Sequence, residues 1–73
     1  MIINSVQIRK QLNAIGIRQQ AEDFISSVSQ DDRDEWNYSP SFSIQDNLIG
    51  RLGIAIGLTE TKLAQFFEDA SKF

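Results

Sequence analysis

The chain has 73 residues, a formal net charge of -3 from seven basic and ten acidic side chains, and neither cysteine nor histidine. This composition excludes disulfides, zinc fingers, thiol nucleophiles and Ser/His/Asp triads, and it leaves almost no ligands for a transition metal. A core this small supplies only about 3–5 kcal/mol of net stability, so we expect a protein partner or a homo-oligomer.

Residues 1–28 predict an N-terminal helical hairpin. Asn4 or Ser5 can cap the first helix, and Gly16 stands where a C-terminal stop is expected. The first helix would bury Ile8, Leu12 and Ile15. The apolar positions of the second helix recur at helical spacing, and they are Ile17, Ala21, Phe24, Ile25 and Val28.

Residues 29–42 predict a short acidic helix and a loop. The hydroxyl of Ser29 can accept a hydrogen bond from the backbone N–H of Asp32, and the acids that follow suit a helix N-terminus. We expect this helix to end near Trp36. Pro40 then disfavours a helical conformation at Ser39, within the one turn-rich stretch of the chain.

Residues 43–73 predict a C-terminal helix pair. Ser43 with Asp46 resembles a capping box before an apolar helix over Ile44 to Ile56. Gly57 would end that helix and Thr59 would cap the last one, whose buried face would be Leu63, Phe66, Phe67 and Ala70.

The predicted fold is therefore all-α, in a single domain over residues 1–73. It is a small bundle of four to five short helices, in which a helical hairpin is followed by a loop and two further helices. Only Ser41 to Ile44 shows a weak alternating pattern that would suit a strand.

Three glycines lie in the apolar stretch IGRLGIAIG, at positions 50, 53 and 57. A P-loop needs Lys and then Ser or Thr after its last glycine, whereas Leu58 and Thr59 follow here, and the spacing does not fit a dinucleotide fingerprint either. The segment Gly50 to Gly53 does resemble the GXXG loop of RNA-binding KH domains. The interpretation we favour is a helix interior in which Gly50 and Gly53 allow close packing, within the monomer or against a partner.

The acidic cluster of residues 31–35 raises the question of a calcium or magnesium site. The alternating acids, glycine and final glutamate of an EF-hand are absent, so we interpret the cluster as helix N-terminal charge on a solvated surface. We predict no metal, no cofactor and no catalytic residue, and hence no enzyme. A small acidic inhibitor that mimics nucleic acid stays open as a further alternative.

Three aromatic residues, Trp36, Tyr38 and Phe42, are candidates either for the core or for an exposed anchor that holds a partner. For Trp36 we favour the core. With Gly50 and Gly53 they make up the predicted partner-binding residues.

Several short motifs follow one another in the second part of the chain: the segment Asp34-Glu35-Trp36-Asn37-Tyr38, Phe42, the helix start Asp46-Asn47-Leu48, the stop Gly57-Leu58-Thr59, and Phe66-Phe67 followed by Ala70. In these motifs residues 29–73 resemble small proteins from phage and prophage tail-gene regions. The resemblance implies a tail-assembly factor or chaperone that acts by binding other tail proteins.

We therefore predict a non-enzymatic protein interaction module, in which the partner can be a phage structural protein. The alternative is a nucleic-acid-binding protein that uses the N-terminal basic helix and the GRLG segment, through Arg9, Lys10, Arg18 and Arg51. Net negative charge opposes binding to a phosphate backbone, so we do not favour it. No signal sequence or membrane-spanning stretch is evident, which predicts a cytoplasmic protein.

Overall fold

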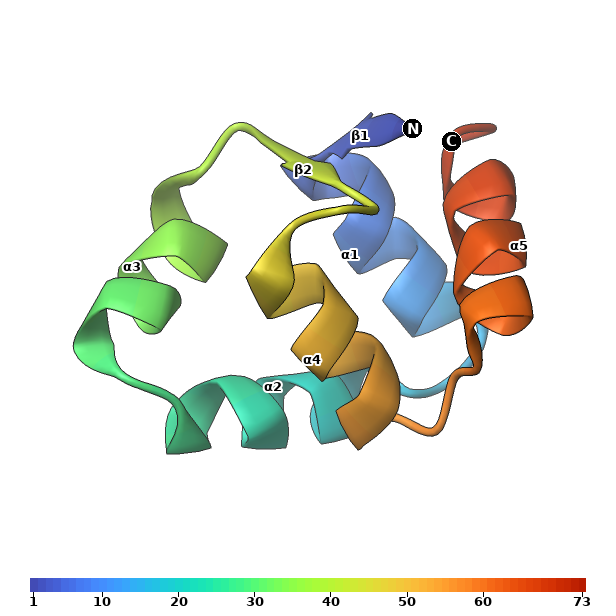
Figure 1. Ribbon diagram of the computed structural model, residues 1–73. Helices are drawn as coiled ribbons and strands as arrows, with labels where there is room; N and C mark the ends of the chain where they lie inside the picture. Colours follow the sequence, from blue (N-terminus) through green and yellow to red (C-terminus); the bar gives the residue numbers. More distant parts are fainter.

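Five helices and two short strands make up the chain, and the computed structural model describes all of residues 1–73. The predicted helical class is confirmed, and one small sheet is added to it (Figure 1). In chain order the elements are β1 (Ile2–Asn4), α1 (Ser5–Ala14), α2 (Arg18–Ser27), α3 (Gln30–Tyr38), β2 (Ser41–Ser43), α4 (Asn47–Ala55) and α5 (Glu60–Ala70).

The two strands pair in antiparallel fashion, with Ile3 opposite Phe42. Both of these side chains point into the core, while Ile2 and Ser41 point to solvent, as the alternation of a strand requires. The pairing continues beyond the strands, because Ser5 N donates to Pro40 O at 3.1 Å. The sheet thus holds the start of the chain against its middle (Figure 1).

Several predicted helix ends are confirmed. Asn4 caps α1 in a capping box, in which its Oδ1 accepts from Gln7 N at 2.7 Å and Gln7 Oε1 accepts from Asn4 N at 2.8 Å. Ser29 caps α3, and Thr59 caps α5. The chain takes positive φ angles after α1 and α4, at Gly16 (76°) and Gly57 (82°), where glycine carries no steric penalty.

The predicted start of α4 was wrong by three residues. The helix begins at Asn47, and Asp46 occupies the N-cap position. One of the two bonds of the predicted capping box is present, because Ser43 N donates to Asp46 Oδ2 at 2.9 Å, whereas the Ser43 hydroxyl accepts from Gln45 N at 3.1 Å and not from Asp46 N. Ser43 ends β2, and a turn at Ile44 and Gln45 separates the strand from the helix. The acidic helix α3 continues past the expected end at Trp36, to Tyr38.

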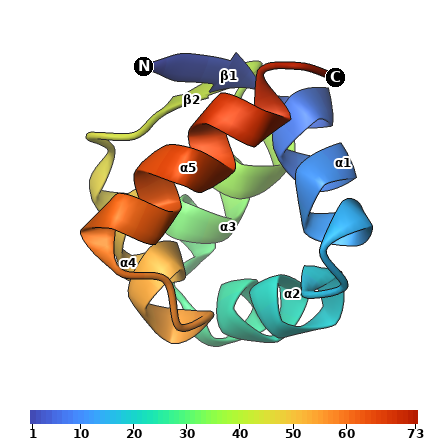
Figure 2. The same ribbon diagram turned by 90° about the vertical axis from the view of Figure 1, so that its right-hand side faces the viewer.

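Helices α1 and α5 pack against each other, and α2 packs against α1, α3 and α4 (Figures 1 and 2). The two ends of the chain lie near each other, since Gln7 Nε2 on α1 donates to Ser71 O at 3.3 Å and to Phe73 O at 3.4 Å. None of the helices combines the length and apolar character that crossing a membrane requires.

Thirteen buried apolar side chains form one core, with members from every helix and both strands. Trp36 and Phe42 are each only 1% exposed, and their ring centroids lie 5.4 Å apart. This burial corrects the prediction that Trp36 and Phe42 contact a partner, and it confirms the core interpretation for Trp36. A domain this small has few large side chains with which to fill its interior.

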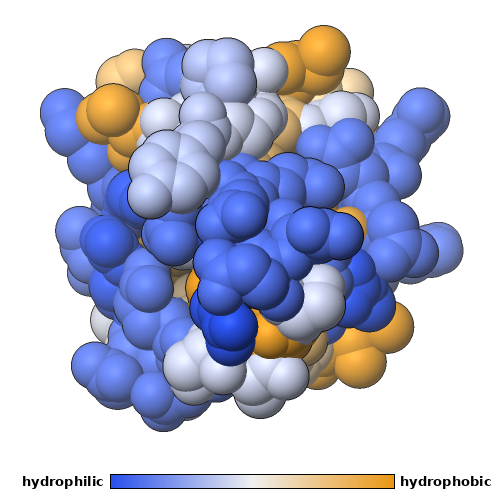
Figure 3. All heavy atoms as spheres, turned by 90° about the vertical axis from the view of Figure 1, so that its left-hand side faces the viewer, coloured by the Kyte–Doolittle hydropathy of each residue, from blue (hydrophilic) through white to orange (hydrophobic).

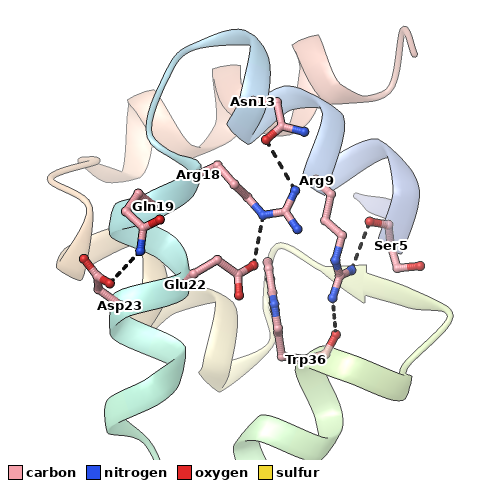
Figure 4. Close-up of polar contacts among 8 residues, drawn as sticks. All are labelled: Ser5, Arg9, Asn13, Arg18, Gln19, Glu22, Asp23 and Trp36. Carbon is pink, nitrogen blue, oxygen red and sulfur yellow. Dashed lines mark hydrogen bonds and ion pairs between the residues drawn. The ribbon is translucent and has the colours of Figure 1, made fainter.

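Arg9 joins α1 to α3 at the edge of this core. Its guanidinium carbon lies 4.6 Å from the centroid of the Trp36 ring, Nη2 donates to Trp36 O at 2.7 Å, and Nη1 donates to Ser5 O at 3.1 Å (Figure 4). Desolvation by burial lowers the pKa of Arg9, the positive charge of Arg18 lowers it further, and Glu22 raises it. The group stays protonated at neutral pH, because arginine loses its proton only far above it.

We expect Phe42→Ala and Tyr38→Ala to have very different effects on stability. Removing the buried ring of Phe42 costs about 3–5 kcal/mol, which is comparable to the whole stability of a domain this size. Tyr38 is 80% exposed, so its loss changes the free energy of unfolding by less than about 0.5 kcal/mol. The free energy of unfolding of both variants is measured by circular dichroism and by the fluorescence emission of Trp36, the single tryptophan. Equal losses would contradict the placement of the two rings.

Candidate functional site

The structure contains a single hollow, a groove where the first turns of α4 and α5 meet the segments that precede them. Its volume is about 670 Å³. The apolar lining comes from four side chains, Ile44, Ile54, Leu58 and Leu63, together with Gly50. The polar lining is Gln45, Asp46, Asn47, Arg51, Thr59 and Glu60. An apolar floor with a polar rim is the arrangement typical of a surface that receives an apolar side chain.

The two helical glycines have different roles in α4. A Cβ atom added at Gly53 would lie 3.3 Å from Leu63 Cδ2, so this glycine lets α5 approach closely, as predicted. A Cβ added at Gly50 would meet nothing within 4 Å. Close packing within the chain is therefore confirmed at Gly53, whereas Gly50 faces the open space of the groove, where the other predicted alternative, packing against a partner, stays a prediction.

The GRLG segment lies inside α4, which corrects the comparison with a KH loop. A GXXG clamp presents free backbone groups to the nucleic acid, whereas Gly50 N donates to Asp46 O at 2.9 Å in the helix. The sheet has two strands of three residues each, and neither adjoins this segment.

The charged side chains that line the groove have only some of their hydrogen bonds and ion pairs satisfied within the chain. Arg51 donates from Nη2 to Asp32 Oδ2 of α3 at 2.9 Å and from Nε to Asn47 Oδ1 at 2.8 Å. These bonds leave Nη1 without a partner. The two ion pairs of the structure are Arg51 with Asp32 and Arg18 with Glu22, so the carboxylate of Glu60 at the start of α5 has no basic partner.

Of the four basic side chains that were predicted to contact nucleic acid, the three arginines bind other groups of the chain. Arg9 binds Trp36 and Ser5 as described, and Arg18 pairs with Glu22 at 2.9 Å and contacts Asn13 Oδ1 at 3.3 Å (Figure 4). Arg51 pairs with Asp32 of α3 at 2.9 Å. Lys10 is exposed. The four cations therefore do not form one continuous basic surface.

The acidic residues of α3 lie on a hydrophilic face. Asp32 pairs with Arg51, Asp34 Oδ1 accepts from Gln30 Nε2 at 2.7 Å, and Asp31 and Glu35 are exposed. No group of three or more carboxylates is arranged to hold a metal ion. Figure 3 shows the largely hydrophilic surface over α3, with apolar spots toward its edges.

Of the predicted partner-binding residues, Tyr38 and Gly50 are accessible, and Trp36, Phe42 and Gly53 are buried. The sequence did not single out Ile44, Ile54 and Leu58 as surface groups. Ile54 is 79% exposed although it lies in the most apolar helix. The sequence did contain a signal for this exposure, because Ile54 lies one turn after Gly50 and on a different face of the helix from Leu48 and Leu52.

Comparisons of the chain with protein-family models, with curated proteins and with solved structures find no match.

We expect Gly50→Ala to stabilise the monomer and Gly53→Ala to stabilise it less or to destabilise it. Alanine in a helix interior is better than glycine by about 0.8–1 kcal/mol. At Gly50 the new methyl group meets open space, whereas at Gly53 it presses on Leu63. Urea unfolding at low protein concentration measures the difference. An equal gain at both positions would contradict the distinct packing of the two glycines.

Proposed function

We propose that this protein is a non-enzymatic protein-binding module, and that the groove between α4 and α5 is its binding surface. The observation that carries the proposal is the open apolar floor at Gly50 beside the exposed side chain of Ile54. Exposed apolar groups around a hollow are typical of surfaces that bind other proteins. The polar rim, with Arg51 and Glu60, would set the orientation of the partner.

The residue inventory supports a function by binding rather than by chemistry. The chain lacks the cysteine and histidine on which most nucleophilic and acid–base sites depend. The groove contains two carboxylates, and one of them, Asp46, already accepts a hydrogen bond from the backbone of Ser43.

The more specific proposal is an assembly factor or chaperone that binds phage tail proteins. It rests on the resemblance of residues 29–73 to proteins of phage and prophage tail-gene regions. The Gly57-Leu58-Thr59 segment of that resemblance contributes Leu58 and Thr59 to the groove. The proposed binding surface and the resembling segment therefore overlap.

A pull-down with three forms of the tagged protein tests this function. Lysates come from cells that naturally carry the gene, with and without phage induction, and each is also treated with nuclease. We expect phage structural proteins to be enriched by the wild type and by Tyr38→Lys, and to be reduced at least about tenfold by Ile54→Lys. The two positions are matched, being 80% and 79% exposed.

The other outcomes separate the alternatives. Loss of the partner with Tyr38→Lys but not with Ile54→Lys would move the binding surface to the end of α3. Recovery of nucleic acid, with loss of every protein after nuclease, would contradict the proposal and favour the nucleic-acid alternative.

A further inference from the structure

Gly50 has no explanation within a single copy of the chain. Glycine weakens a helix interior relative to alanine. Gly53 is explained by the close approach of Leu63, but nothing lies within 4 Å of a Cβ at Gly50. Its φ angle is not positive either, unlike those of Gly16 and Gly57. A group from outside the chain could use the space that the missing side chain leaves.

The most exposed aliphatic side chain stands beside this space. Ile54 follows Gly50 by four residues on α4, so both lie on the same face of the helix. A protruding side chain and a hollow on one face are complementary to each other when two copies meet about a two-fold axis, because each copy then supplies both parts.

We infer that a second copy of this chain occupies the groove, in a two-fold dimer in which Ile54 of each copy packs over Gly50 of the other. The inference rests on the proposed function, in that it assigns a partner to the same protein-binding groove. It also supplies the additional apolar burial that a domain of 73 residues lacks.

The charges of the rim fit the same arrangement. Arg51 has a free Nη1 and Glu60 has no basic partner within the chain, and both line the groove. In the dimer that we infer, Arg51 of each copy pairs with Glu60 of the other, so that the two contacts join opposite charges. Such pairs contribute more to the register of an interface than to its affinity.

The other exposed apolar side chains do not offer a comparable site. Met1, Ile2, Val6 and Phe73 lie near the two chain ends and are all more than half exposed, and Ile15, just after α1, is 47% exposed. The only hollow in the structure is the groove at α4 and α5. A protruding side chain therefore has no place to enter at the chain ends.

Sedimentation velocity of the full chain, from low micromolar to millimolar concentration, tests the dimer. We expect the wild type to shift from monomer to dimer, and Ile54→Lys to weaken the association at least about a hundredfold, since two apolar contacts are lost per dimer. Gly50→Ala should weaken it about tenfold or more, although the same change stabilises the monomer. Tyr38→Lys and Val6→Lys are the controls and should dimerise as the wild type does.

The charge pair gives a second test that does not depend on filling the hollow. Glu60→Arg should weaken the dimer several-fold, and adding Arg51→Glu in the same chain should restore part of the loss, because both contacts between the copies are then reversed. Circular dichroism verifies that each variant is folded.

A wild type that stays monomeric at millimolar concentration would overturn the inference, as would a dimer that Ile54→Lys leaves intact. Association lost with Val6→Lys alone would overturn it too, because it would place the contact at the chain ends. A monomeric wild type that still captures a phage protein through Ile54 would leave the proposed function standing. A dimer without any captured protein would support the inference while the function in tail assembly fails.

Discussion

Trp36 lies between the ring of Phe42 and the guanidinium of Arg9, and this contact holds together three segments that are far apart in the chain. Through Phe42, β2 and its partner strand β1 are held against α3. Through Arg9, which donates a hydrogen bond to Trp36 O, α1 is held against α3 as well. In a protein with 13 core side chains and no disulfide, few other contacts join so many elements. The arrangement also explains why the basic N-terminal helix does not offer Arg9 to a phosphate, since a buried ring and two carbonyls already hold it.

The groove is a consequence of how α4 meets α5. Gly53 lets Leu63 of α5 approach α4 closely. One turn earlier on α4, nothing in the chain lies within 4 Å of a Cβ placed at Gly50, which lines the groove. The stability of the core and the shape of the groove therefore depend on two glycines that look equivalent in the sequence. One lets two helices pack, and the other leaves the groove open.

Most of the helical fold could be predicted because its signals are local. The caps at Asn4, Ser29 and Thr59 and the stops at Gly16 and Gly57 depend on residues a few positions away. The sheet could not be predicted, because β1 has three residues and its partner lies some 40 positions away, too far for periodicity to detect. The site was found only in part. The sequence indicated Gly50, but Ile44, Ile54 and Leu58 meet there only through the packing of α4. Aromatic residues suit a core and a binding surface equally well, so the sequence kept both Trp36, for which the core was favoured, and Phe42 as partner-binding candidates, and both are buried.

If the groove is the surface for protein contacts that we propose, its methyl groups should report every association of the protein. Methyl NMR spectra of the wild type, recorded through a dilution series and again with a captured partner, measure this. We expect shifts confined to the methyl groups around the groove, those of Ile44, Ile54, Leu58 and Leu63, with little change at Ile2 and Val6 near the chain ends. Shifts concentrated at Ile2 and Val6, or no shift at any groove methyl while a partner binds, would contradict it.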